Sequence, residues 1–107
     1  MSEPDNLEVD ERRGDSVTAR VRGDLDIVTS DDFKRQLAGV FDAGPVKLVL
    51  DMGQVRFVDS SGLGALVAIH RTAEAADGQF TVRAVPPQVQ RLFEITRLGD
   101  LLSVEQD

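Results

Sequence analysis

The stretch Phe57 to Ala65, FVDSSGLGA, joins an apolar strand-like run to the glycine-rich start of a helix. Two runs between residues 46 and 58 are rich in β-branched and apolar side chains, as strands are. From Leu63 onward, apolar residues recur at helical spacing. The junction therefore predicts an α/β fold. It places Ser60 or Ser61 at the helix N-cap, where a hydroxyl oxygen accepts from a free backbone N–H group.

Two glycines, Gly62 and Gly64, fall in the first turn of this predicted helix, where each costs about 0.5–1 kcal/mol relative to alanine. Two explanations stay open. A helix tip without side chains lets the backbone of another molecule approach the serines, or the helix packs closely against its own sheet. The N–H groups and dipole of the tip also favour anions, so the fold would tolerate a phosphate on a serine here.

The composition is that of one globular domain spanning residues 1–107, with a single modest core. Hydrophobic residues make up 41% and charged residues 29% of the chain, which argues against global disorder. The chain has no cysteine, so disulfides and thiolate metal sites are excluded, and its single histidine makes a histidine-based metal site unexpected. We therefore predict no cofactor.

The charge balance favours protein partners over nucleic acid. The formal net charge is −7, and the arginines are scattered along the sequence among acids, whereas nucleic-acid recognition needs a basic face. The acidic start shows no signal peptide, and the longest apolar run, residues 63–69, is far too short to cross a bilayer. We expect a cytoplasmic protein that contacts neither membranes nor nucleic acid.

Turn signals and periodicity predict strands and helices that alternate along the chain. Strands are expected over residues 7–12, 16–22, 46–51, 79–85 and 101–105. Helices are expected to begin at residues 29–30, in the serine motif and at residues 86–87, and to end at residues 42–45, 78 and 98–99. The order β-β-α-β-α-β-α-β predicts an α/β domain with a mixed four- to five-stranded sheet and alternating helices, its core within residues 7–105.

Three local expectations refine this outline. Residues 46–51 are apolar enough to be buried on both faces, as in a parallel sheet. The segment GDLD, residues 23–26, is expected to be a turn or strand end, with Asp24 in solvent and Asp26 capping the turn. In the last helix the apolar positions are Val89, Leu92 and Phe93, with Ile95 as a further candidate.

A serine hydrolase does not fit the motif. The nucleophile elbow Gly-x-Ser-x-Gly is missing at both serines. The single possible base, His70, lies ten residues along the same predicted helix, about 15 Å from Ser60 at the rise of a helix. We read His70 as a partly exposed helix residue, and we predict that the protein is not an enzyme.

Two ligand-site interpretations are also weak. A receiver-like pocket around Asp24 and Asp26 needs a lysine at the end of a late strand, where Arg83 stands. Gly62-x-Gly64 lacks the third glycine of a dinucleotide fingerprint, and no Walker lysine accompanies it. A nucleotide held loosely at the helix tip stays open.

The motif DSSGLG, residues 59–64, closely resembles the central motif of the anti-sigma-factor antagonists, the single-domain members of the STAS family. The resemblance extends to other segments of the sequence. These are GDLD at residues 23–26, VKLVLD at 46–51 and PPQVQRLF at 86–93, followed by Leu98 and Leu101. Together they cover about residues 7–105 and imply the STAS fold.

The resemblance implies a phosphorylation switch. A partner-switching serine kinase, which is also an anti-sigma factor, would phosphorylate Ser60. The unphosphorylated chain would bind that kinase and release a sigma factor, phosphorylation would end the binding, and a phosphatase would reset it. The implied partner-binding residues are Asp24, Asp26, Asp59, Ser60, Ser61, Gly62, Leu63 and Gly64. The alternative is an unphosphorylated STAS scaffold subunit of another complex, such as one for lipid transport, and a weak homodimer is left open.

Overall fold

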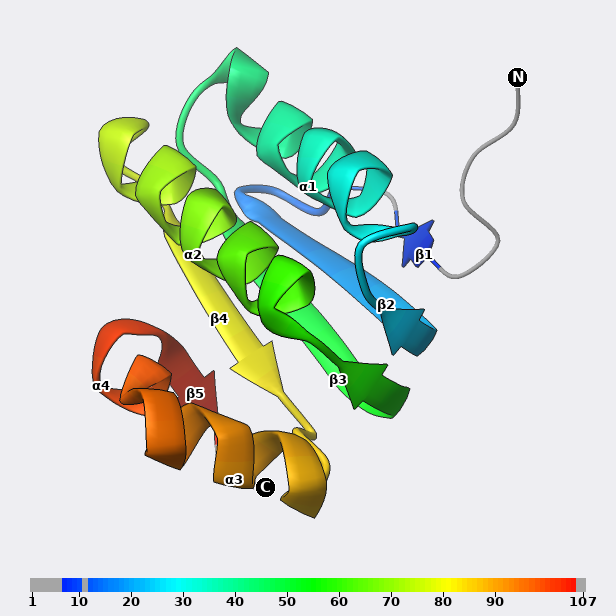
Figure 1. The fold of residues 1–107 in the computed structure, drawn as a ribbon. Helices are drawn as coiled ribbons and strands as arrows, with labels where there is room; N and C mark the ends of the chain where they lie inside the picture. Colours follow the sequence, from blue (N-terminus) through cyan, green and yellow to red (C-terminus); the bar gives the residue numbers. More distant parts are fainter. Residues whose placement is uncertain (1–6, 11, 106–107) are drawn as a thin grey trace.

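The computed structural model of the chain describes residues 7–10 and 12–105 (Figure 1). Within these residues, five strands form one sheet: β1, Leu7–Val9; β2, Ser16–Leu25; β3, Lys47–Val58; β4, Gln79–Arg83; and β5, Ser103–Glu105. The helical segments are α1, Ser30–Gly39; the 3-10 turn η1, Val40–Ala43; α2, Ser60–Ala75; α3, Pro87–Thr96; and the single turn α4, Leu98–Leu101. The predicted α/β class and alternating order are confirmed, and α4 is an addition to them.

Each strand lies beside its neighbour in the sequence, so the sheet order is β1-β2-β3-β4-β5. β1 runs antiparallel to β2, and the other three pairs are parallel. Each parallel crossover carries a helix and moves one place in the same direction, and such crossovers are almost always right-handed. The helices therefore lie on one face of the sheet, where Figure 1 shows α1 and α2 side by side.

Strand side chains alternate between a buried face and a bare face opposite the helices. Ala19, Leu50 and Val82 are register partners on β2, β3 and β4, and each is fully buried. Lys47 and Val49 point to the bare face, where Lys47 is exposed and Val49 half-buried. The prediction that this strand is buried on both faces is wrong, because no helix in the described part of the chain covers the second face.

One row of charged residues crosses the bare face from edge to edge. Its members are cross-strand register partners, one on each strand: Glu8, Arg20, Asp51, Arg83 and Glu105. Neighbours in the row have opposite charges, with Arg20 Nη1 3.7 Å from Glu8 Oε1 and Arg83 Nε 3.6 Å from Asp51 Oδ2. Such exposed pairs are individually weak, but opposite charges placed directly across strands favour this register.

β2 and β3 run further than predicted, to Leu25 and Val58, so residues 23–25 continue a strand. In two places β3 has one more residue than β2 between paired positions, which makes two β-bulges. The bulges bring Met52, Val55 and Val58 to the buried face at a spacing of three. This spacing hides the second half of β3 from a search for period-two alternation, and it explains why the prediction stopped at Asp51.

Other boundaries also differ from the prediction. β1 ends at Val9, and residue 11 of the predicted strand lies outside the described residues. α3 ends before Arg97, whose left-handed φ of 63° breaks the helix, and Leu101 belongs to α4 and not to the last strand. Ile95 is 71% exposed and is not a core residue.

The one-sided cover of the sheet predicts unequal effects of two neighbouring substitutions. Leu50→Ala removes a fully buried side chain and should lower the free energy of unfolding by about 2–5 kcal/mol. Val49→Ala, on the bare face of the same strand, should lower it by less than about 1 kcal/mol. Urea unfolding followed by circular dichroism measures both, and equal losses would contradict a sheet covered on one face only.

Candidate functional site

A single carboxylate joins the start of α2 to the loop between β2 and α1. Asp59 is the N-cap of α2, and its Oδ1 accepts from the Gly62 N–H at 3.0 Å. Its Oδ2 accepts from the Ile27 N–H at 3.3 Å, and its own N–H donates to the Leu25 carbonyl at 3.2 Å. Because Asp59 is bonded in three directions, α2 begins at a fixed place beside the end of β2.

Ser60 is the first residue of α2, and its side chain is exposed. The prediction that Ser60 or Ser61 caps the helix is wrong. Asp59 has the extended backbone that a cap needs, with φ −106° and ψ −171°, and its carboxylate reaches both the first turn and the neighbouring loop. Neither serine hydroxyl has a hydrogen-bond partner among the described residues. The Ser60 hydroxyl is therefore open to a reagent from solvent.

Asp26 shapes the loop that faces this motif. Its Oδ1 accepts from the N–H groups of Val28 at 3.0 Å and Thr29 at 3.2 Å, so its predicted role as a turn cap is confirmed. The Thr29 hydroxyl accepts from the Asp26 N–H and donates to the Asp24 carbonyl, both at 3.0 Å. Asp24 lies beside β3, where Arg56 Nη2 is 3.1 Å from its Oδ1. The two predicted acids thus hold the loop and the strand ends around the motif.

The two glycines of the motif have different surroundings. A Cβ on Gly62 would lie 2.3 Å from the Leu25 carbonyl oxygen and 3.0 Å from Val58 Cγ1, so α2 needs glycine there to approach the sheet. A Cβ on Gly64 would meet nothing within 4 Å. Packing against the sheet therefore explains Gly62 and leaves Gly64 unexplained. Leu63, between them, is partly buried against the core.

Three large apolar side chains lie around the motif and are exposed, which sequence analysis missed. Ile27 is 75% exposed and Val28 81%, both in the β2–α1 loop, while Phe57 is 52% exposed near the end of β3. We call these three residues the apolar collar. Their one sequence signal is the adjacent pair Ile27-Val28 in an otherwise polar loop. Grouped exposed apolar side chains are typical of protein interaction sites.

A surface hollow of about 290 Å³ lies between α1 and α2 next to the collar. Its lining consists of Ile27, Ser30, Asp31, Lys34, Ser61, Gly64 and Ala65. The structure thus brings Ser61 and Gly64 of the predicted motif beside Ile27 of the collar. The lining contains one acidic side chain, Asp31, and one basic side chain, Lys34. Neither is hydrogen-bonded to the Ser61 hydroxyl, so the hollow does not resemble a nucleophile with its general base.

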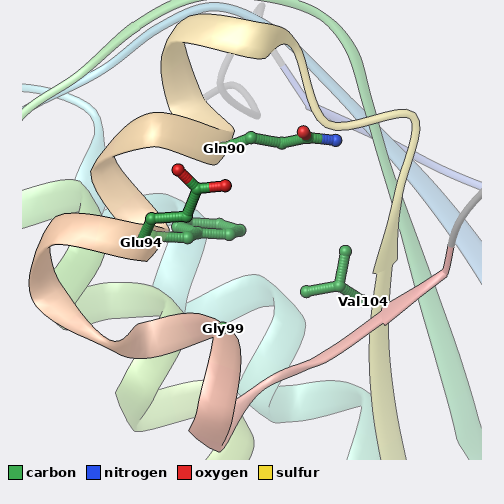
Figure 2. Close-up of a pocket in the computed structure, with 5 residues that line it drawn as sticks. Gln90, Glu94, Gly99 and Val104 are labelled. Atoms are coloured by element: carbon green, nitrogen blue, oxygen red, sulfur yellow. The ribbon is translucent and has the colours of Figure 1, made fainter.

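A second hollow, between α3, α4 and β5, lies on a different part of the fold. Figure 2 shows Gln90 and Glu94 on α3 opposite Val104 on β5, with Gly99 at the start of α4. The volume is about 160 Å³. Its lining contains one titratable group and none of the predicted site residues, so it does not extend the site.

The structure also shows how His70 and the acidic residues lie, on which a serine hydrolase or a metal site would depend. His70 is half-buried on α2, and its Nε2 lies 3.5 Å from Glu74 Oε1, one turn further along the same helix and away from the serines. Within residues 7–10 and 12–105, no three His, Cys, Asp or Glu side chains gather as metal ligands would. No helix in this part of the chain is both long and apolar enough to span a membrane.

The family model described as STAS domain matches residues 6–107 of the sequence. The chain belongs to the STAS domain family. An anti-sigma-B factor antagonist of Staphylococcus aureus is 30% identical over 87 residues, which cover 81% of each chain. The crystal structure of an anti-sigma factor antagonist from Mycobacterium paratuberculosis matches with 28% identity and a TM-score of 0.78, covering 97% of this chain and 89% of the other.

A STAS fold is also seen in the Bacillus cell fate determinant SpoIIAA in its phosphorylated form, which matches at 20% identity with a TM-score of 0.75. This match covers 94% of the present chain and 90% of SpoIIAA and, at that identity, concerns the fold alone. The resemblance expected from the motif DSSGLG is confirmed. In this STAS domain the motif forms the strand–helix junction described above.

The two glycines of the STAS motif predict opposite effects on stability. Gly62→Ala should lower the free energy of unfolding by more than about 1 kcal/mol, because the new Cβ overlaps the Leu25 carbonyl and α2 must move. Gly64→Ala should raise it by about 0.5–1 kcal/mol, because alanine is the better helix former and the position is open. Chemical denaturation of both variants measures the difference, and a loss of stability in Gly64→Ala would contradict this structure of the helix tip.

Proposed function

We propose that this STAS domain is an anti-sigma-factor antagonist whose binding to an anti-sigma factor kinase is ended by phosphorylation of Ser60. The supporting observation is the exposed, unpaired Ser60 hydroxyl at the start of α2, next to the exposed apolar collar. The names of the relatives support an anti-sigma factor as the partner. In this proposal a phosphatase resets the switch. Regulation by binding, with no reaction catalysed by the chain itself, is the corresponding role.

The topology supports a protein-binding surface over a nucleotide site. In doubly wound sheets, ligands bind in a crevice that opens where the strand order reverses. Here the order β1-β2-β3-β4-β5 never reverses, so the carboxyl ends of the parallel strands open no such crevice. At the carboxyl ends of these strands, the Ile27 N–H donates to Asp59 Oδ2, and Ile27 lines a hollow together with Ser61 and Gly64. An exposed, partly apolar surface of this kind suits another protein.

The proposed binding mode follows from which side chains of this surface are exposed to solvent. Ile27, Val28 and Phe57 would be covered by the partner, which removes their apolar surface from water. Gly64 has no side chain and no packing role, so it lets the partner backbone approach Ser60 and Ser61 closely. Asp24, Asp26 and Asp59 lie at the same surface and favour a partner with basic side chains.

A phosphate on Ser60 would change this surface and leave the fold intact. It adds about −1.5 to −2 charges beside the Asp59 carboxylate. The first-turn N–H groups of α2 would stabilise the dianion within the domain, because a helix N-terminus favours negative charge. A bound partner would have to desolvate that dianion at its interface. A loss of about 3–4 kcal/mol already weakens binding several hundredfold.

Phosphorylation of the chain by its kinase should be confined to Ser60. The purified chain is incubated with ATP and an anti-sigma factor kinase from the organism that encodes it, and the phosphate is mapped by mass spectrometry. Ser60→Ala should abolish the modification. Ser61→Ala, which removes only the hydroxyl of the half-buried neighbouring serine, should retain it. A stable complex without any phosphorylation would refute the switch and leave the STAS scaffold as the function.

The apolar collar should contribute to partner affinity and little to folding. Val28→Ser should weaken binding of the anti-sigma factor kinase about tenfold or more, because an exposed apolar contact is lost from the interface. Ile95→Ser is the matched control, since Ile95 is 71% exposed on α3 and remote from the motif. Calorimetric titration measures both affinities, and equal weakening by the two variants would contradict the collar as the contact surface.

A further inference from the structure

The bare face of the sheet gathers arginines that are far apart in the sequence. A hollow of about 670 Å³ on this face is lined by four arginines, one threonine and one aspartate, namely Arg12, Arg13, Arg20, Arg83, Thr18 and Asp10. They come from the segment after β1 and from strands β2 and β4. Arginines that are scattered among acids in the sequence are thus gathered at one hollow, with acids of the same face still beside them.

We propose that this hollow is a second binding site of the protein, and that its ligand is a compact anion carrying two or more phosphate groups. Guanidinium groups suit phosphate because their planar fork donates two parallel hydrogen bonds to its oxygens. Four of them around one hollow present an array that a single phosphate does not fill. The volume lies within the range of small-molecule sites.

In two of the four guanidinium groups, both terminal nitrogens are without a hydrogen-bond partner among the described residues. Arg12 uses its Nε to donate to the Gly14 carbonyl at 2.7 Å, which leaves its two terminal nitrogens. Arg13 has no side-chain hydrogen bond or ion pair with another described residue. A phosphate in the hollow gains hydrogen bonds from both without breaking one that the described residues make.

The other two guanidinium groups are held in place by weak pairs. Arg83 Nε lies 3.6 Å from Asp51 Oδ2, which is longer than a hydrogen bond. Arg20 donates to Asp10 Oδ1 at 3.2 Å, and that bond raises the pKa of Arg20. These pairs orient the side chains and leave other donors of each fork for a ligand.

The surrounding charges set the size of the ligand. Glu8 and Glu105 end the charged row at the two edges of the sheet and repel any anion long enough to cross it. An anion that stays between them avoids Glu8 and Glu105 and meets Arg20 and Arg83, which are separated in the row by Asp51. The Asp51 and Asp10 carboxylates are each within 4 Å of one of these arginines, and Asp51 Oδ1 also accepts from the Gly53 N–H, so the ligand needs the added charge of Arg12 and Arg13 to bind here. The lining contains no aromatic side chain on which a base would stack, so the phosphates themselves are what the site recognises.

The site is separate from the surface around Ser60. Its residues lie on the face of the sheet opposite α1 and α2, whereas Ser60 begins α2 at one end of β3. A ligand here and a protein partner at the collar are able to bind together. The proposal therefore does not depend on the switch proposed above, and either one stands if the other fails.

The test is a titration of the full chain, labelled with ¹⁵N, with inorganic triphosphate at low salt. We expect saturable shifts of the amide signals of Thr18, Arg20 and Arg83 and of the arginine Nε–H signals. Arg13→Gln and Arg83→Gln should each raise the Kd about threefold or more, and the double variant about tenfold or more. Arg91→Gln, an exposed arginine on α3, is the matched control and should leave the Kd unchanged.

Several results would overturn the proposal. One is the absence of saturation up to about 5 mM triphosphate, which corresponds to a binding free energy weaker than about −3 kcal/mol at the 1 M standard state. Another is a rise in Kd in Arg91→Gln equal to that in the hollow variants. A third is a set of shifts centred on Gly62 and Leu63 at the helix tip. A ten-residue oligoglutamate that binds more tightly than triphosphate would also overturn it and indicate an acidic protein segment. Ser60→Ala should bind triphosphate as the unaltered chain does, and a loss of affinity in that variant would contradict a separate site.

Discussion

The position of the functional surface depends on the two-sided carboxylate of Asp59. One oxygen caps α2 through Gly62, and the other accepts from Ile27 in the loop that precedes α1. A shorter cap such as serine satisfies the first bond and does not reach the second. The same residue therefore fixes where Ser60 is presented and how the loop carrying Ile27 and Val28 lies beside it. A negative charge added at Ser60 arises next to the group on which this arrangement depends.

The strand order explains why one face of the sheet packs against helices and the other face does not. Crossovers that all move in one direction place every helix on one side, and the core fills the space between that side and the helices. The other side carries no helix in the described residues and is polar, with the alternating row from Glu8 to Glu105. The partner surface that we propose at the strand ends and the anion site that we propose on the bare face thus lie on different parts of this topology.

The sequence predicts the elements well and the bulges poorly. The order of strands and helices and the turn role of Asp26 follow from periodicity and turn chemistry, whereas α2 ends at Ala75 and not at the predicted Gly78. The continuation of β3 to Val58 does not, because two bulges replace the alternation by a spacing of three. The sequence also does not reveal that Asp59, and not a serine, caps α2, because Ile27, the second hydrogen-bond partner of Asp59, is distant in the sequence.

Some parts of the candidate site are likewise visible in the sequence, and others are visible only in the structure. The motif at residues 59–64 is visible in the sequence, and the structure shows that its two glycines have different roles. The apolar collar is not visible, because the exposure of Ile27, Val28 and Phe57 is set by a loop and by the end of a bulged strand. The gathering of Arg12, Arg13, Arg20 and Arg83 is a property of strand register and escapes any local pattern.

The most direct test of the switch compares the unmodified chain with one that carries phosphoserine at position 60, incorporated during synthesis. The dissociation constant of each for the anti-sigma factor kinase is measured by calorimetry, and the amide spectrum of each is recorded. We expect binding about a hundredfold weaker or more for the phosphorylated chain, with spectral changes confined to the start of α2 and the neighbouring loop. Equal affinities, or weak binding accompanied by loss of the folded spectrum, would contradict it.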